Sequence, residues 1–257
     1  MGIFRPSFSL GWSRAFGGGG GGGGPSALPN AIAALTPEYY YKLDDASSPF
    51  LNSGSIAGTI TGVGATAAGT VGPDGRDYVA LATSGDAYLN IPDNTALTPG
   101  ATGMTVVFMY RSSDLSAFKY LMGKAGASNS SREWYVVRNV TRLRGGRINT
   151  AGGIYSERTG DISFVVDEWS MIAVTFTNNT VPALIYMNGV SENAASVAAT
   201  GTPTGDTTSA VCIGAFRDVS GGGNSSGQFA HVAIWDHVLS PSEITALATA
   251  ATASGWI

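Results

Sequence analysis

The segment Gly227-Gln-Phe-Ala-His-Val-Ala-Ile-Trp-Asp-His-Val-Leu-Ser-Pro-Ser-Glu-Ile244 indicates a strand that leads directly into a helix. Residues 229–235 are almost all apolar, which is typical of a short buried strand. Ser240 is then the predicted N-cap, Pro241 takes the first helical position, and Glu243 completes a capping box. Apolar residues continue on one helical face at Ile244, Leu247, Ala248 and Ala251. We therefore expect the chain to end in a buried strand and one short, well-capped helix.

Upstream of this segment, short apolar runs alternate with turn-forming residues at nearly regular intervals. The pair Asn188-Gly189, for example, suits a type I′ hairpin turn. Charged residues make up 12% of the 257 residues and glycine occurs 36 times, which fits twisted sheets joined by many turns. The predicted strands are Tyr39–Leu43, Tyr78–Leu81, Ala87–Ile91, Met104–Tyr110, Lys119–Gly123, Trp134–Leu143, Arg147–Tyr155, Ile162–Val166, Trp169–Thr177, Ala183–Met187, Ala210–Ile213 and Phe229–Trp235. This pattern predicts an all-β sandwich.

Several stretches together carry a family resemblance. In chain order they are 38–45 (EYYYKLDD), 84–92 (SGDAYLNIP), 168–176 (EWSMIAVTF), 183–190 (ALIYMNGV), 212–215 (CIGA) and 227–244. They resemble, in the same order, motifs of the concanavalin A-like lectin/glucanase superfamily and of its laminin-G-like domains. The resemblance covers roughly residues 38–250. It implies a two-sheet jelly-roll sandwich with a short C-terminal helix, and recognition of a surface ligand rather than chemistry.

The first 29 residues differ from the rest of the chain. Residues 1–16 are a predicted extended anchoring arm, because large apolar residues alternate there with small ones, as in a strand that buries one face. Residues 17–29 hold eight consecutive glycines, which as a free tether would span ~16 Å. Residues 30–257 form the predicted laminin-G-like domain. The anchoring residues are Phe4, Phe8, Leu10, Trp12 and Phe16, and an unstructured tail is the alternative.

Charge and apolar pattern argue against several classes of protein. The formal net charge of −4 disfavours a nucleic-acid binder. No run reaches the roughly 18 apolar residues of a membrane span, and residues 1–16 do not resemble a secretory signal. Cys212, the single cysteine, is expected to be a small buried side chain in a strand. We therefore expect synthesis in a host cytoplasm, no export by an obvious route and no membrane insertion.

The arm, the absence of an export signal and an outward-facing type of domain favour a subunit of an assembled particle. We expect a bacteriophage virion protein, oligomeric in the assembly, such as a tail, fibre or capsid-decoration subunit. Its arm would bind other virion subunits, and its lectin-like domain would face host surface glycans. The alternative is a structural decoration or cement protein that binds no sugar. This step rests partly on analogy between folds.

A glycan hydrolase is the lesser alternative, and we expect no enzymatic activity. Retaining glycoside hydrolysis needs two carboxyl groups about 5–5.5 Å apart. Related glucanases are implied by the resemblance to carry them in a Glu-x-Asp-x-x-Glu strand, which this sequence lacks. The acidic pairs 44–45 and 167–168 are adjacent residues, whose side chains diverge on a strand. His231 and His237 have no zinc-type spacing and are expected to be structural.

Arginines concentrate between residues 132 and 158. The pair Gly145-Gly146 predicts a tight hairpin turn that brings Arg144 opposite Arg147, an unfavourable pairing unless an anionic ligand is bound there. A solvated hairpin paired with acidic neighbours is the alternative. The candidate residues for binding a carbohydrate, such as an acidic polysaccharide, are Arg138, Arg142, Arg144, Arg147, Trp134 and Tyr155.

Calcium is the one cofactor left open, because the resemblance implies that several laminin-G-like domains hold this ion. Oxygen ligands are available from side chains in predicted turns. Ordinary turn formation is the alternative role for each of them. The candidates form two alternative sets, Asp86, Asp93 and Asn94, or Asp218 and Asn224.

Overall fold

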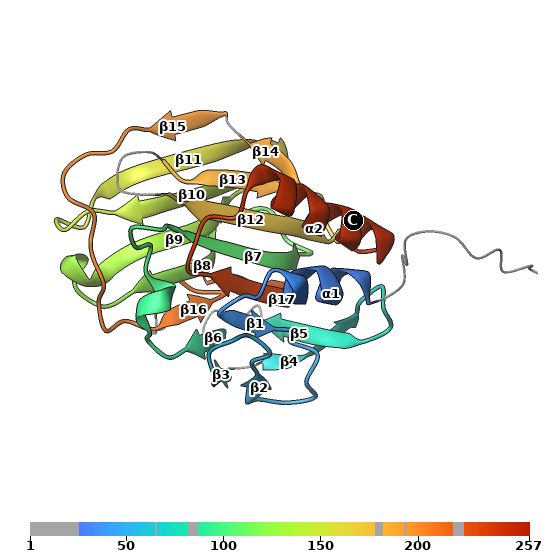
Figure 1. The fold of residues 1–257 in the computed structure, drawn as a ribbon. Helices are drawn as coiled ribbons and strands as arrows, with labels where there is room; N and C mark the ends of the chain where they lie inside the picture. Colours follow the sequence, from blue (N-terminus) through green and yellow to red (C-terminus); the bar gives the residue numbers. More distant parts are fainter. Residues whose placement is uncertain (1–25, 65, 82–86, 178–181, 193, 218–223) are drawn as a thin grey trace, which may run out of the picture.

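Strand pairing defines two sheets in the computed structural model, which describes residues 26–64, 66–81, 87–177, 182–192, 194–217 and 224–257. The sheets lie face to face (Figure 1). Neighbouring strands within each sheet are antiparallel, as in the pairing of Tyr39–Tyr41 with Gly227–Trp235. The predicted all-β sandwich with one short C-terminal helix is confirmed. The arm of residues 1–16 and the candidates Asp86 and Asp218 lie outside the described residues.

One sheet has eight strands. They are β1 (Tyr39–Tyr41), β4 (Thr66–Val71), β5 (Asp77–Leu81), β7 (Met104–Arg111), β12 (Ser170–Phe176), β13 (Leu184–Met187), β14 (Val190–Glu192) and β17 (Gly227–Trp235). Their spatial order is β14-β13-β12-β7-β17-β5-β4, and β1 pairs with part of β17. The strand predicted from the opening segment is therefore central, with β7 along one side and β1 and β5 along the other.

The other sheet has nine strands. They are β2 (Phe50–Leu51), β3 (Thr59–Val63), β6 (Tyr88–Ile91), β8 (Lys119–Ala125), β9 (Arg132–Asn139), β10 (Arg142–Ile148), β11 (Ile154–Ser163), β15 (Ala195–Val197) and β16 (Val211–Ile213). Their order is β15-β11-β10-β9-β8-β16-β6-β3-β2. Two short 3₁₀ helices, η1 (Thr95–Leu97) and η2 (Asn129–Ser131), lie in the loops. Cys212 is buried in β16, as expected.

The main hydrophobic core fills the space between the sheets. On β7, Val106 and Phe108 face this core, whereas Val107 and Met109 at the alternate positions face the outer side of the sheet. Both faces of β7 are buried, which explains why its sequence is apolar without the usual alternation.

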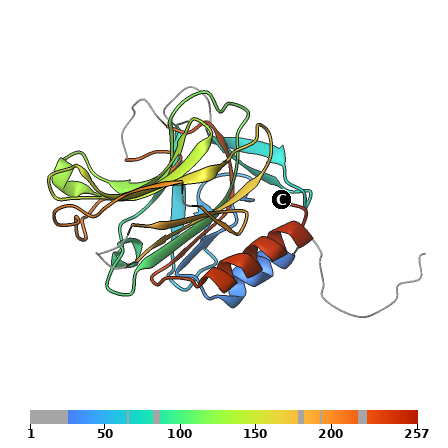
Figure 2. The same ribbon diagram turned by 90° about the horizontal axis from the view of Figure 1, so that it is seen from above.

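Two helices cover the outer face of the eight-stranded sheet, and Figure 2 shows them side by side. They are α1 (Ala27–Ala34) and α2 (Pro241–Ala253). The Leu28 N–H donates to Ser254 Oγ at 3.1 Å, which ties the start of α1 to the end of α2. Residues 27–29, assigned to the tether from the sequence, form the first turn of α1. Neither helix has the length and apolar character needed to span a bilayer.

The helix boundary predicted from the opening segment is confirmed. The Glu243 N–H donates to Ser240 Oγ at 3.3 Å, and the Ser240 N–H donates to Glu243 Oε2 at 2.7 Å. These reciprocal bonds form the capping box, with Pro241 as the first helical residue. The hydrogen bond from the Ser240 backbone also lowers the pKa of Glu243, because it stabilises the ionised carboxylate.

Two glycine-containing pairs behave differently from each other. Asn188 and Gly189 have φ values of 52° and 81° and join β13 to β14, as predicted for a type I′ turn. The predicted turn at Gly145-Gly146 is wrong, because both residues lie inside β10. The chain instead turns near Val140, whose φ is 59°.

The glycines of β10 allow close packing rather than a turn. A Cβ on Gly145 would meet Val174 Cγ1 of the opposite sheet at 2.9 Å, and one on Gly146 would meet Tyr135 Oη at 2.6 Å. Arg144 consequently pairs with Val137 and Thr159 across the sheet, not with Arg147. The like-charge pairing that suggested an anionic ligand is therefore absent.

A bulge in β17 places His231 in a buried aromatic cluster. Its φ is 51°, and its ring lies 5.0 Å from that of Trp256, centroid to centroid. Its Nδ1 lies 2.9 Å from Tyr40 Oη, and its Nε2 lies 3.3 Å from Tyr78 Oη. Burial lowers the pKa of His231 to about 4. His231 therefore has the structural role that the sequence suggested, joining β1 and β5 to the C-terminal residues.

Candidate functional site

The nine-stranded sheet carries a cavity of about 290 Å³ on the face turned away from the other sheet. Alternation along β9 explains its position, since Trp134 and Val136 face the core while Tyr135 and Val137 face outward. Ile148 of β10 packs with these two outward residues in a small hydrophobic cluster. An outer sheet face that carries rings and aliphatic groups instead of polar ones is a candidate binding surface.

Three aromatic rings form one wall of the cavity. The rings of Tyr120 and Phe216 are stacked, with centroids 4.8 Å apart and planes at 12°. Phe118 meets Tyr120 edge-on at 5.0 Å and is 40% exposed. This wall presents flat apolar surface to solvent beside polar groups, the combination found in small-molecule sites.

Charged groups also line the cavity. Glu157 of β11 accepts a hydrogen bond from Tyr135 Oη at 2.6 Å and faces Arg144 Nη1 at 3.4 Å. Burial, followed by the hydrogen bond to Glu157, raises the pKa of Tyr135, so this hydroxyl stays protonated. Arg132 also lines the cavity. Burial raises the pKa of Tyr120, and the nearby charges of Arg132 and Arg217 partly oppose that rise. Two guanidinium groups, those of Arg132 and Arg144, thus line the cavity together with one carboxylate that is already paired, which favours an anionic ligand.

The sequence comparisons give the chain a family. A model described as "Concanavalin A-like lectin/glucanases superfamily" matches residues 83–245. The chain belongs to this superfamily. No curated protein sequence matches it. The expected laminin-G-like resemblance is thereby confirmed at the level of the superfamily.

Solved structures share the superfamily fold at low identity. The binding domain of Paraclostridial mosquitocidal protein 1 is similar with a TM-score of 0.65 and 13% identity, over 83% of this chain and 52% of that one. Domain 4 of an extracellular arabinanase from Geobacillus stearothermophilus, solved with arabinotriose, gives 0.60 and 15%, over 83% and 98%. The botulinum neurotoxin serotype D ligand-binding domain, solved with N-acetylneuraminic acid, gives 0.63 and 11%, over 85% and 52%. The chain therefore spans about half the length of the two toxin structures.

Most arginines predicted for the site of this lectin-type domain lie elsewhere. Arg144 lines the cavity, and its role in binding a saccharide stays a prediction. Arg138 is fully buried and donates from Nη2 to the Asp114 carbonyl at 2.8 Å. Arg147 is buried and donates to the Thr204 carbonyl at 3.3 Å, and burial lowers its pKa. Arg142 is exposed outside the cavity.

The two aromatic candidates are buried. The Trp134 indole Nε1 donates to the Leu97 carbonyl at 2.9 Å inside the core, so this ring cannot stack on a sugar. Tyr155 is 5% exposed on β11. Sequence reasoning missed the cavity rings Tyr120, Tyr135 and Phe216. The signal for Tyr135 was available, because it is adjacent to Trp134 on a strand and must face the other side.

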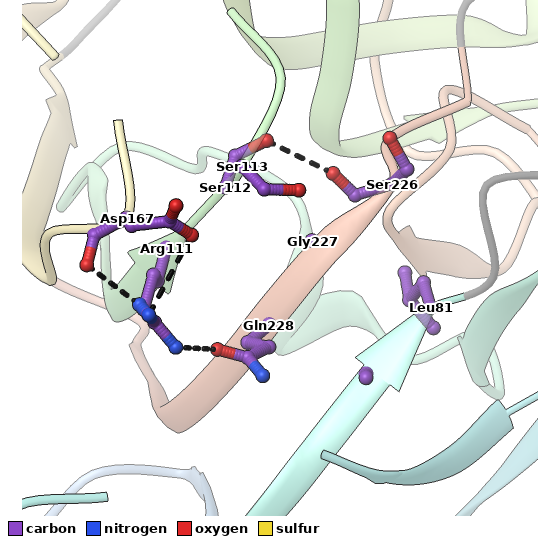
Figure 3. A pocket seen from close by; sticks show the side chains of 9 residues that line it. Leu81, Arg111, Ser112, Ser113, Asp167, Ser226, Gly227 and Gln228 are labelled. Carbon is purple, nitrogen blue, oxygen red and sulfur yellow. Dashed lines mark hydrogen bonds and ion pairs between the residues drawn. The ribbon is translucent and has the colours of Figure 1, made fainter. Parts of the chain in front are cut away.

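A second cavity of about 230 Å³ lies where β7 and β17 pair near their ends on the eight-stranded sheet. Figure 3 shows that its polar groups bind one another. Arg111 donates from Nη1 to Gln228 Oε1 at 3.0 Å and from Nε to the Asp167 carbonyl at 2.7 Å. Ser112 Oγ donates to the Ser226 carbonyl at 3.2 Å. Without an aromatic ring among its described lining residues, this cavity is the weaker candidate for a saccharide.

Two of the described calcium candidates already have partners within the chain. Asp93 Oδ1 lies 2.9 Å from Lys124 Nζ, and the Asn94 side chain accepts the Ala96 N–H at 3.0 Å. Asn224 forms an isolated β-bridge with Tyr120, which lies at the opposite end of β8 from Lys124. Each of the two candidate sets includes a residue outside the described ranges, so a calcium site at either set stays a prediction. The predicted roles of residues 86 and 218 stay untested.

Lys124 is the centre of a buried ionic cluster. Its Nζ lies 3.2 Å from Glu133 Oε1 and 3.0 Å from Asp206 Oδ1, in addition to Asp93. Burial by itself lowers the pKa of Lys124, but the surrounding carboxylates outweigh it and the net pKa is raised. Burial raises the pKa of Glu133, because the lost hydration outweighs Lys124 and the hydrogen bonds from its threonine neighbours. The ammonium thus occupies the point where these carboxylates converge.

Proposed function

We propose that this protein is a non-catalytic recognition module that binds an acidic saccharide in the cavity on β8 to β11. The supporting observation is the combination of an aromatic wall with the guanidinium groups of Arg132 and Arg144 and one paired carboxylate, Glu157. The apolar C–H face of a sugar ring can pack on Phe118 and Phe216. A carboxylate or phosphate on the sugar can accept hydrogen bonds from Arg132 and Arg144.

The solved relatives support this choice of ligand. One was solved with arabinotriose and another with N-acetylneuraminic acid, which is an acidic sugar. The acids at the cavity support binding without cleavage. Among its described lining residues, Glu157 is the one carboxylate, and Tyr135 and Arg144 already hold it. Glycoside hydrolysis by the usual route requires a second carboxyl group.

Calorimetry with acidic and neutral oligosaccharides tests the proposal. Arg132→Met is expected to weaken binding of the acidic ligand about ten- to hundredfold, since a hydrogen bond to a charged group contributes roughly 1.5–3 kcal/mol. Arg142→Met is the matched control, because Arg142 is exposed outside the cavity. Phe216→Ala is expected to weaken acidic and neutral ligands alike. Equal affinities for wild type and Arg132→Met, or no binding to any acidic saccharide, would refute the assignment.

We also propose that residues 1–16 attach the domain to an assembled particle such as a bacteriophage virion, with other virion subunits as partners. Support comes from the alternating apolar residues 8, 10 and 12 and from the glycine run that follows. An apolar strand of this kind can pair with a sheet edge of a neighbouring subunit. Such a protein would be oligomeric in the assembly and would present its cavity outward.

Co-sedimentation with particles tests the attachment. Replacing Phe8 and Trp12 by Glu is expected to release the protein, whereas the same change at Ser9 and Ser13, on the opposite face of the alternation, is expected to leave it attached. If both double variants stay attached, the arm is not the anchor. Particles that carry Arg132→Met separate the two roles. Lost adsorption to host cells supports an adhesin, and unchanged adsorption supports a cement protein that binds no sugar.

A further inference from the structure

We infer that Glu38, Asp236 and His237 form a binding site for zinc or a similar divalent transition-metal ion. One ligand atom from each residue lies within 4.8 Å of those of the other two. Glu38 precedes β1, whereas Asp236 and His237 follow β17. The antiparallel pairing of these strands therefore brings together residues that are 198 positions apart in the chain.

Bonds from outside the cluster hold the backbone that carries the ligands. The carbonyl of Asp236 accepts a hydrogen bond from Thr102 Oγ1 at 2.8 Å, and that of His237 accepts one from Thr105 Oγ1 at 2.8 Å. The Asp236 N–H donates to Glu38 Oε2 at 2.9 Å, which leaves the other oxygen of this carboxylate for an ion. Folding thus gathers the three ligands before any ion binds, which lowers the entropic cost of binding.

The geometry and the types of ligand favour zinc over calcium. An ion about 2.0–2.2 Å from each ligand requires ligand atoms no more than ~4.4 Å apart, so a shift of about half an ångström would close the site. Exposed side chains can make that shift, and Asp236 is 57% and His237 46% exposed. One imidazole with two carboxylates suits zinc, whereas calcium takes six to eight oxygen ligands. Water would complete the coordination.

A bound ion would connect two parts of the chain. It would join the entry to β1 with the link between β17 and α2, and thereby stabilise the folded domain. The site lies at the eight-stranded sheet, separate from the saccharide cavity on the nine-stranded sheet. Zinc binding and saccharide binding can therefore be measured independently.

Titration of the full chain with zinc chloride, after removal of any histidine tag, tests the inference. We expect saturable binding of one ion per chain, and an increase in Tm of about 5–10 °C at zinc concentrations 100-fold above Kd. His237→Ala and Glu38→Gln should each weaken binding by more than about tenfold. Glu168→Gln, which removes an exposed carboxylate elsewhere, should leave affinity unchanged.

Two results would overturn the inference. One is a wild-type chain that shows no saturable binding. The other is a folded His237→Ala variant that binds zinc as tightly as wild type. Because His237 is half exposed, this variant is expected to fold even if Glu38→Gln does not.

Discussion

Replacing Lys124 by Met is expected to cost about 3–5 kcal/mol of unfolding free energy at pH 7, because it leaves a buried carboxylate without its cation. Glu133 is 0% exposed, so water cannot replace the lost ammonium. Asp93 and Asp206 are 30% and 44% exposed and regain hydration, so their ion pairs add little to the cost.

The cost stays within this range because Glu133 keeps other partners. Thr98 Oγ1 and Thr207 Oγ1 donate to its carboxylate at 2.7 and 2.6 Å, and the Thr207 N–H donates at 2.9 Å. For a domain of this size, the expected loss corresponds to a decrease in Tm of about 6–20 °C. Urea unfolding and thermal unfolding measure both quantities. Lys119→Met, on the same strand but only partly buried, is the matched control.

The loss should depend on pH in a defined direction. Burial already raises the pKa of Glu133 in the folded protein, and removal of Lys124 raises it further. Because the pKa of Glu133 is raised in the folded state, the stability that this group contributes is fully present below its pKa in the unfolded chain, ~4.3. That contribution is lost as the pH rises through the pKa in the folded protein. Lys124→Met should therefore lose less unfolding free energy at pH 5 than at pH 8. Adding Glu133→Gln to this variant should restore most of the lost unfolding free energy. A loss below about 1 kcal/mol, or one independent of pH, would refute this reasoning.

Three further predictions concern buried groups. Because the pKa of His231 is lowered to about 4, its contribution to stability is present above pH ~6.5 and is lost as the pH falls toward 4, by up to about 3 kcal/mol. His231→Gln should reduce this dependence of the unfolding free energy on pH, as measured by denaturation at several pH values, and an unchanged dependence would contradict the assignment. Gly146→Ala should cost about 1–3 kcal/mol and weaken saccharide binding, because the new Cβ would displace Tyr135; unaltered stability would show that the ring can move freely. Trp256→Ala should cost about 3–5 kcal/mol in urea unfolding, since this buried ring packs on His231 and Tyr78; a loss under 1 kcal/mol would mean that the C-terminal residues are not docked.

The sequence alone determined the features that depend on neighbouring residues. The capping box at Ser240 and the turn at Asn188-Gly189 are local hydrogen-bonding and φ preferences, so residue identity is enough to place them. The alternation of short apolar runs with turn residues is also a local pattern, and it predicted the all-β sandwich. Burial of Cys212 followed from its apolar neighbours.

Only the tertiary structure decided what depends on distant contacts. Gly145 resembles a turn residue locally, but it is required because the opposite sheet approaches there, which no neighbouring residue signals. Arg138 and Arg147 look like surface arginines, yet backbone carbonyls from other parts of the chain accept their hydrogen bonds inside the protein. The candidate cavity combines Tyr120 of β8 and Phe216 beyond β16 with seven further positions on β9, β10 and β11. Its charge and shape arise only once strand pairing has brought these segments together, because the neighbours of a strand within a sheet are set by long-range pairing rather than by adjacent residues in the sequence.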